Sequence, residues 1–365
     1  MELPRIKIGL NNNYFPVHCA DRYTHVLLTG KSGTGKSSLL ASWWQQDEFY
    51  RNAKVLVEPS GFLSRDCLSI SKGKALYCSI ETPVSLNPMA QPYHPDQIVD
   101  IITEAINQVV MATTANAELT VKMRSYLDEA IKWCLGRNRR SLLNVRDYLE
   151  SRKSDVTLEG LIARLNHLLG DERMQEILCG TRAPIEWGKF IANRQTLIVD
   201  GFGMGKDRSI LLGSLVTHGV KSFFRFQRPK TYRPLALYID EAQNYISANL
   251  FDILKEARKF RIGCILSTQN FSTIPERVVK ELLNVGTLVT FRVGHDVAVK
   301  LAHEMGMDSF ELQRLPKYHV AFMTPTVTGI AKAPRPPITK KIEPRAEKPK
   351  PKFKGGWFRL EPYTP

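Results

Sequence analysis

Short runs of apolar residues, each bounded by turn-forming residues, recur along the chain and predict buried β-strands. Each run is four to seven residues long and rich in Val, Ile and Leu. Because the apolar residues follow one another instead of alternating with polar ones, both faces of each strand should be covered by helices. The pattern therefore predicts an α/β fold with a largely parallel sheet. The runs are Thr24–Leu28, Lys54–Val57, Ala75–Ile80, Thr196–Asp200, Leu235–Ile239, Ile262–Ser267, Thr287–Val293 and His319–Met323.

Between residues 95 and 190 the apolar positions recur at helical spacing instead. Residues three and four apart share one face of a helix, so these stripes predict amphipathic helices that pack into a core. We expect an all-helical insertion that interrupts the α/β domain. The expected division is 1–94 and 191–330 for the two parts of the core, 95–190 for the insertion and 331–365 for a tail.

The predicted tail differs in composition from the rest of the chain. Residues 331–365 hold 10 Lys and Arg against 3 Glu, and 8 of the 21 prolines. Such a segment cannot bury enough apolar surface to pack a core, so we expect it to be extended and flexible. Trp357 and Phe358 near its end are either a docking anchor for a partner or an incidental apolar end.

The charge of the whole chain narrows the class of partner. The 365 residues include 51 Lys and Arg against 36 Asp and Glu, a net charge of +15, which favours nucleic acid and less often an anionic membrane surface. Hydrophobic residues at 43% exclude a wholly disordered or collagen-like chain. No apolar run is long enough to cross a bilayer, and Met1–Arg5 lacks the pattern of a signal peptide. We therefore expect a cytoplasmic protein without a membrane span.

A glycine-rich segment from Gly30 to Ser37 matches the P-loop pattern G-x-x-x-x-G-K-[ST] and lies between a predicted strand and a helix-like run. Glycines let backbone N–H groups surround phosphates, and the following helix adds partial positive charge. Lys36 can reach the β- and γ-phosphates, and the Ser37 hydroxyl can bind Mg²⁺. ATP and Mg²⁺ are thus the expected cofactors. The nucleotide-binding residues that we predict are Gly30, Ser32, Gly33, Thr34, Gly35, Lys36, Ser37 and Ser38.

Two polar segments at predicted strand ends complete a candidate catalytic site. Asp240 and Glu241 follow a buried strand, where a P-loop NTPase holds its Mg²⁺. We predict Asp240 as a metal ligand and Glu241 as the general base that orients the attacking water. Gln269 ends another predicted strand and can report the state of the γ-phosphate to the rest of the domain.

An arginine is also expected, because the charge that develops during phosphoryl transfer needs a stabilising cation, often from a neighbouring subunit. Arg258 and Arg261 precede the strand that ends near Gln269, and Arg292 ends the segment Thr290-Phe291-Arg292. We favour Arg258 and leave the other two open.

Together these segments resemble the HerA/FtsK superfamily of P-loop motors, most closely the conjugative coupling proteins of the TraG/TraD type, the type IV secretion ATPases and the HerA-like translocases. The likeness extends over about residues 20–325, and its most specific parts are Asp240–Gln243 and Glu256–Phe260. The segments that carry it are Gly30–Ser37, Val55–Pro59, Leu86–Met89, Gln195–Phe202, Ile239–Tyr245, Glu256–Phe260, Leu266–Gln269 and Leu283–Thr287.

The resemblance implies a RecA-like core, a helical insertion between the two Walker motifs, and a ring of six subunits in which ATP hydrolysis drives DNA through a central channel. It also implies that Gln269 is a sensor and that Arg258 acts on the neighbouring subunit. The chain departs from the family pattern at Glu58–Gly61, where many relatives have Asp-Pro-Lys-Gly. The membrane anchor and the large N-terminal domain of typical relatives have no counterpart, so we expect a bare motor with a basic tail.

The function that we predict is an ATP-driven translocase of double-stranded DNA, for genome packaging or for transfer of a mobile element. Phosphate contacts from Lys and Arg suit it, because they do not depend on base sequence. Alternatives are a nucleotide-dependent adaptor or scaffold, a protein-substrate secretion ATPase, and a single-strand helicase.

The predicted partners, besides DNA and further copies of the chain in a homohexamer, are a capsid, a relaxase or a secretion pore. They would bind the tail or the helical insertion, and they would place the protein peripherally at a membrane pore or a capsid vertex. The tail itself is a DNA clamp, a partner anchor or a strap onto the next subunit. We expect truncation after Gly329 to weaken DNA binding and to leave the fold intact.

Overall fold

The computed structural model describes residues 6–8, 16–17, 21–48, 52–114, 117–153, 155–227, 233–245, 254–269, 271–272, 274–340 and 342. Within these residues the core is a nine-stranded sheet in the order β11-β10-β9-β3-β8-β7-β4-β6-β5. The strands from β9 to β5 in this order are parallel to one another, β10 is antiparallel to β9, and β11 is antiparallel to β10. The strands are β3 (Val26–Thr29), β4 (Ala53–Glu58), β5 (Leu76–Cys78), β6 (Thr196–Asp200), β7 (Leu235–Ile239), β8 (Ile262–Thr268), β9 (Thr287–Thr290), β10 (His319–Met323) and β11 (Thr328–Lys332).

Helices cover both faces of this sheet, as the continuous apolar runs predict. Along β3, Val26 and Leu28 pack into one buried cluster and Leu27 packs into another, because successive side chains point to opposite faces. Helices α1 (Lys36–Glu48) and α2 (Phe62–Ile70) contribute to the first cluster. The α/β fold with a largely parallel, RecA-like sheet is therefore confirmed.

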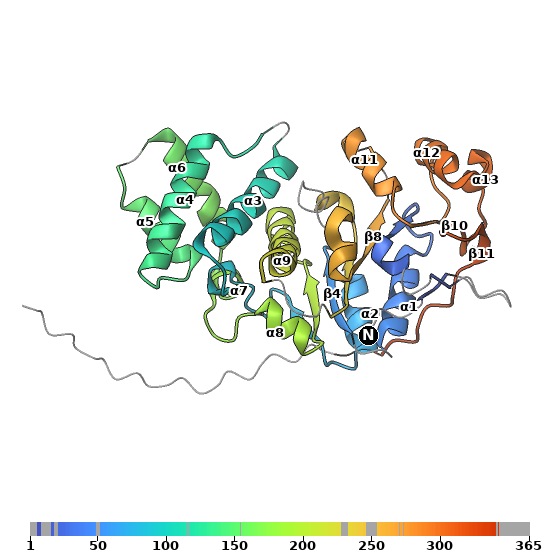
Figure 1. Ribbon diagram of the computed structural model, residues 1–365, viewed down its shortest axis with the longest axis horizontal. Coiled ribbons are helices and arrows are strands. Elements are labelled where there is room, and N and C mark those ends of the chain that lie inside the picture. The colour runs from blue at the N-terminus through green and yellow to red at the C-terminus, as the bar shows by residue number, and fades with distance from the viewer. Residues whose placement is uncertain are drawn as a thin grey trace, which may run out of the picture.

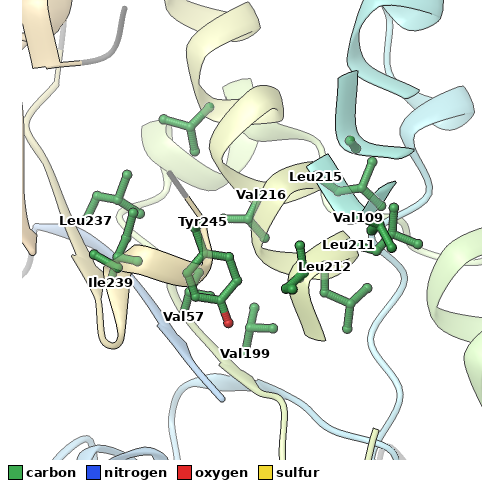
Figure 2. Close-up of a cluster of buried hydrophobic side chains, with 14 of the residues drawn as sticks. Val57, Val109, Val199, Leu211, Leu212, Leu215, Val216, Leu237, Ile239 and Tyr245 are labelled. Carbon is green, nitrogen blue, oxygen red and sulfur yellow. The ribbon is translucent and has the colours of Figure 1, made fainter. Parts of the chain in front are cut away.

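On the second face, α9 (Lys206–Gln227) packs beside the sheet and α3 (Pro95–Thr113) lies beyond α9 (Figure 1). Figure 2 shows how their side chains meet those of the strands. Val57, Val199, Leu237 and Ile239 of the sheet are buried in one cluster with apolar residues of α9 and with Val109 of α3. The same hydrophobic core thus joins the sheet to the first helix of the segment that follows β5.

The structure describes six α-helices between β5 and β6, and Figure 1 shows α4, α5 and α6 away from the sheet. Several begin at a side chain that accepts a hydrogen bond from a backbone N–H of the first turn, which replaces a partner that the helix itself cannot supply. Thr120, Ser141, Asp155 and Asp171 all act in this way. Besides α3, the helices are α4 (Val121–Gly136), α5 (Leu142–Glu150), α6 (Val156–Leu169), α7 (Glu172–Cys179) and α8 (Trp187–Ala192).

The C-terminal part of the core contains α11 (Glu276–Leu283), α12 (His295–Met305) and α13 (Ser309–Gln313), around the edge formed by β9, β10 and β11. A separate pair, β1 (Ile6–Lys7) and β2 (Pro16–Val17), is antiparallel. The short 3₁₀ segments are η1 (Asp21–Thr24), η2 (Pro88–Ala90), η3 (Ala242–Asn244) and η4 (Ala257–Phe260).

All eight predicted strands are present, and β6, β7 and β10 have the predicted bounds. The sequence pattern misses β1, β2 and β11. In β11 only Ala331 is buried, so this edge strand has no apolar run to reveal it. The strand also extends past residue 330, where we expected the tail to begin.

Part of the predicted tail lies against α2. The Thr339 hydroxyl donates to the Asp66 carboxylate at 2.9 Å, and the backbone N–H of Lys340 donates to the Ser69 hydroxyl at 2.9 Å. Trp357 and Phe358 lie outside the described residues. Among the described helices, none combines the length and the apolar character that a bilayer span requires.

Candidate nucleotide site

The P-loop connects β3 to α1, and its glycines are required by close contacts as well as by backbone conformation. Gly30, Gly33 and Gly35 all have positive φ angles, of 155°, 73° and 120°. A Cβ atom on Gly30 would lie 2.8 Å from Cβ of Phe291, and one on Gly35 would lie 3.1 Å from the ring of the same residue. Only glycine lets this loop fold tightly against Phe291.

Lys36 opens α1 and is buried, with its ammonium group turned back over the loop. Its Nζ donates to the carbonyl oxygen of Gly30 at 2.7 Å and to that of Lys31 at 3.2 Å. Burial lowers the pKa of Lys36, and the negative charges of Glu241 and Asp240 oppose this shift. The P-loop lysine and the acidic pair, 204 residues apart in sequence, therefore belong to one site.

The remaining P-loop residues leave the outer side of the loop open. Thr34 donates its hydroxyl to the carbonyl oxygen of Lys31 at 2.7 Å, which closes the turn. Nothing lies within 4 Å of the place where a Cβ on Gly33 would stand. Ser32 and Ser37 are exposed, and Ser38 is half-buried in the first turn of α1.

Asp240 directly follows β7 and is almost fully buried. Its backbone N–H donates to the carbonyl oxygen of Val57 on β4 at 3.0 Å, which fixes it at the end of the sheet. Burial, together with the nearby negative charges of Glu241 and Glu58, raises the pKa of Asp240 to about 6. Such a carboxylate gains by binding a cation, because the cation compensates the cost of burying its charge.

Glu241 is held by two amide side chains. Nε2 of Gln269, which directly follows β8, donates to one carboxylate oxygen, and Nε2 of Gln243 donates to the other. Gln243 in turn accepts a hydrogen bond at 2.7 Å from the Thr268 hydroxyl. The backbone of Glu241 is left-handed, with φ 49° and ψ 50°, a conformation that costs free energy for a non-glycine residue.

Gln243 is a site residue to which the sequence pattern assigned no role. It lies in the segment Asp240–Gln243 that carries the family resemblance, and this was the available signal. Its role depends on Thr268 at the end of β8, a contact that only the paired strands create.

The three candidate arginines separate by position. Arg258 in η4 and Arg261 precede β8, whereas Gln269 follows it. Seven extended residues span about 20 Å, so neither arginine lies at the P-loop of its own chain. Arg292 follows β9, and its carbonyl oxygen accepts a hydrogen bond from the N–H of Lys31 at 3.0 Å. Its exposed side chain is thus attached beside the P-loop of its own chain.

The loop after β4, where the chain departs from the family pattern, is closed by Glu58. This buried carboxylate accepts hydrogen bonds from the N–H groups of Ser60 and Gly61 at 2.7 Å each and from the Ser64 hydroxyl at 2.7 Å. Since the N-cap residue Gly61 has no side chain, Glu58 caps α2 in its place. Ser60, at the position of the family lysine, is turned inward to Glu58 by its hydroxyl.

Comparisons with known proteins give matches only among solved structures. No family model and no curated protein matches the chain. The bacterial conjugative coupling protein TrwBΔN70, in complex with sulphate, superposes with a TM-score of 0.71 and 16% identity over 89% of this chain and 88% of that chain. The plasmid coupling protein TrwB in complex with ADP and Mg²⁺ gives 0.67 and 19% identity over 89% and 88%. VirB4 of Thermoanaerobacter pseudethanolicus gives 0.66 and 14% identity over 91% and 97%.

The chain therefore has the fold of TrwB and VirB4 along nearly its whole length. A conjugative coupling protein is among the kinds of protein that the motifs resemble, so the resemblance is confirmed at the level of the fold. Within that fold, β3, β7 and β8 bring the P-loop lysine, an acidic pair and two amides to the same edge of the sheet.

Proposed function

We propose that this protein, built on the fold of TrwB and VirB4, is a Mg²⁺-dependent ATPase that moves double-stranded DNA. The observation that carries the proposal is the assembly of Lys36, Asp240, Glu241 and Gln269 at one edge of the sheet. TrwB has been solved with ADP and Mg²⁺ and with a non-hydrolysable ATP analogue, which supports the same cofactors here.

The P-loop fits a phosphate chain by its own geometry. Gly30, Gly33 and Gly35 have positive φ angles and carry no Cβ atom, and the ammonium group of Lys36 already binds the carbonyl oxygens of Gly30 and Lys31. In the proposed function the backbone N–H groups from Ser32 to Ser38 and the Lys36 ammonium hold the phosphates. The Ser37 hydroxyl and the Asp240 carboxylate hold Mg²⁺, which neutralises phosphate charge when bound.

Glu241 orients the attacking water and accepts its proton. Both of its carboxylate oxygens already accept a hydrogen bond from an amide, so a water at Glu241 shares or replaces the bond to Gln243 or Gln269. This exchange links the state of the nucleotide to β8 through Thr268 and Gln269. Gln269 is thereby a sensor, and Gln243 positions the base.

The rest of the proposal concerns the substrate and the assembly. A net charge of +15 supports a polyanion, and contacts to phosphates let a motor grip DNA of any sequence. Arg258 lies too far from its own P-loop to act there, which supports a ring of subunits, proposed as a hexamer, with Arg258 supplied to the neighbour. DNA packaging and conjugative transfer are the two processes that such a motor serves.

The test is ATP hydrolysis by the wild type and by Glu241→Gln, without nucleic acid, with duplex DNA and with single-stranded DNA. We expect duplex to stimulate the wild type, and the variant to lose roughly 10²- to 10⁴-fold in rate, the usual effect of removing a general base. Glu311→Gln, an exposed position on α13, is the matched control and should retain full activity.

Other outcomes would contradict the proposal in different ways. Stimulation by single strands alone would favour a helicase. Hydrolysis that does not respond to nucleic acid would favour a protein pump, and no hydrolysis by the wild type would favour an adaptor.

A further inference from the structure

A groove lies at the amino ends of the parallel strands, whereas the P-loop lies at their carboxyl ends. Among the described residues this groove of about 1020 Å³ is lined by the segments that precede β4, β5, β6 and β7. Figure 1 shows α8 and α2, whose ends also contribute to its lining, on either side of β4. Since the nucleotide site lies at the carboxyl ends of the strands, the groove is separated from it by the length of a strand, about 15–20 Å.

The groove is strongly cationic. Lys72 and Lys74 line it from the turn after α2, Arg194 from the turn after α8, and Arg233 from the segment before β7. In the described part of the chain none of these four side chains has an acidic partner within ion-pair distance. Glu48, the one acidic residue among the described residues of the lining, is already paired with Lys54. Four positive charges therefore face the groove without compensation.

An unpaired buried amide also lies in the wall of the groove. Asn52 lines the groove just before β4, and its side chain is only 4% exposed. Its Nδ2 has no hydrogen-bond acceptor among the described residues, which costs free energy for a buried polar group.

We propose that this groove binds the sugar–phosphate backbone of the DNA that the motor moves. The choice of ligand rests on the proposed function, whereas the location rests on the groove alone. Lys, Arg, Asn, Gln, Ser and Thr side chains make most contacts to phosphate oxygens in protein–DNA complexes, and residues of all six types line this groove. A protein partner would favour apolar or aromatic anchors, and the described part of the lining offers Ile70, Leu76 and Ala192 and no aromatic side chain.

The C-terminal segment extends the same basic surface. Lys340 is tied to Ser69 at the end of α2, next to the groove residues Ile70 and Ser71. A Cβ on Gly73 would lie 3.7 Å from Ile342, so the chain passes beside the turn that carries Lys72 and Lys74.

The variant that tests the groove is Lys74→Gln combined with Arg233→Gln. Lys72 and Arg194 are avoided, because both have left-handed backbone conformations that a substitution would disturb. The matched control is Lys153→Gln combined with Arg182→Gln, two exposed positions outside the groove that give the same change in net charge. Thermal unfolding should be the same for both doubles and the wild type.

The measurement is the affinity of the full chain for a labelled duplex of mixed sequence, by fluorescence anisotropy over a series of salt concentrations. Each lost phosphate contact reduces the slope of log affinity against log salt by about 0.9. We expect the groove variant to lose about 1–2 units of slope and roughly tenfold or more in affinity at low salt, and the control to change little. Hydrolysis of ATP without DNA should be unaffected in both.

Three outcomes would overturn the inference. Equal losses in the groove variant and the control would show that only net charge matters. If the groove variant binds duplex as well as the wild type does, the groove is excluded as a DNA site, and the proposed function is not affected. If the wild type binds no duplex, the DNA-motor function itself fails. Binding of labelled polyglutamate that depends on Lys74 and Arg233 would then assign the groove to an acidic protein.

Discussion

At the scale of single residues, Glu241 has a strained backbone and a carboxylate whose two oxygens each accept a hydrogen bond. Its left-handed φ of 49° aims the side chain at the amides of Gln243 and Gln269. Strain of this kind persists only where surrounding contacts fix the conformation, and here both contacts come from the site itself. The position of the Glu241 carboxylate therefore depends on two glutamines as well as on its own backbone.

His25 is a second residue whose chemistry depends on its surroundings. It is buried between β3 and β8, where Nδ1 accepts a hydrogen bond at 3.1 Å from the N–H of Cys264. Nε2 then carries the proton and donates to the carbonyl oxygen of Leu254 at 3.0 Å. Burial lowers the pKa of His25 to about 4, because the neutral ring is the form that fits.

This pKa predicts a loss of stability in mild acid. Between pH 6.5 and 4 the unfolded chain binds a proton at His25 that the folded chain does not, so the free energy of unfolding falls as the pH falls. His25→Asn should lose about 2 kcal/mol less than the wild type between pH 7 and pH 5. Asn tolerates the φ of 69° and offers an oxygen to Cys264. Chemical denaturation at the two pH values measures the difference.

The control for this experiment is His303→Asn, because the His303 side chain is 85% exposed. It should retain the pH dependence of the wild type. His218, whose pKa burial lowers to about 3, will keep part of that dependence in every variant. Equal pH dependence in His25→Asn and the wild type would contradict the assignment.

At the scale of elements, β11 changes where the core ends. It pairs with β10 from Thr328 to Lys332, and the N–H of Ala333 donates to the carbonyl oxygen of Tyr318 at 2.8 Å. The buried side chains of Ala331 and Ala333 close this end of the sheet. Truncation after Gly329, which we expected from the sequence to leave the fold intact, removes most of this strand.

Two truncations distinguish the strand from the tail. A chain that ends at Gly329 loses the paired residues Ile330, Ala331 and Lys332, so its melting temperature should fall by several degrees. A chain that ends at Lys340 keeps β11 and the contacts with α2, so it should melt like the full chain. Differential scanning calorimetry measures both.

DNA binding by the chain that ends at Lys340 then tests the tail separately. If residues 341–365 clamp DNA, their removal lowers the salt dependence of binding while stability is unchanged. An unaltered salt slope would exclude the clamp and leave the partner anchor and the subunit strap.

At the scale of the whole molecule, the two ends of the parallel strands carry different functional groups. The P-loop and the acidic pair lie at the carboxyl ends of the strands, and Arg258 and the cationic groove lie at their amino ends. In the proposed function, Arg258 can therefore reach a bound nucleotide only when that nucleotide is held by a neighbouring subunit.

Mixed assembly tests this arrangement. We expect Arg258→Ala and Glu241→Gln each to lose ATPase activity, Arg258→Ala by about 10³-fold or more. Mixing the two should restore part of the activity, because some sites then combine an intact base with an intact arginine from the neighbour. Hydrolysis is measured as a function of the mixing ratio. Arg292→Ala is the comparison, since Arg292 is attached beside its own P-loop and should not complement Glu241→Gln.

An additive mixture without recovery would contradict the role of Arg258 on the neighbouring subunit. In that case Arg292, on the same edge as the P-loop, becomes the candidate for the stabilising cation.

The sequence by itself determined the elements and much of the site. Continuous apolar runs mark strands that are buried on both faces, so all eight predicted strands were found, and the glycine spacing of the P-loop marks a local turn. Lys36 was predictable from the P-loop pattern, and Asp240 because it directly follows a predicted strand. These signals are local, and local residue order is what a single sequence records.

Tertiary structure alone decided which distant residues meet. Strand order places β8 between β3 and β7, and this brings Gln269 and Thr268 to Glu241 and Gln243. The same order gathers Lys74, Arg194 and Arg233, which no motif connects, in one groove. An edge strand such as β11 has one side exposed and few apolar residues, so pairing with β10 defines it. Contacts between chain segments far apart in sequence follow from packing, which the order of residues does not display.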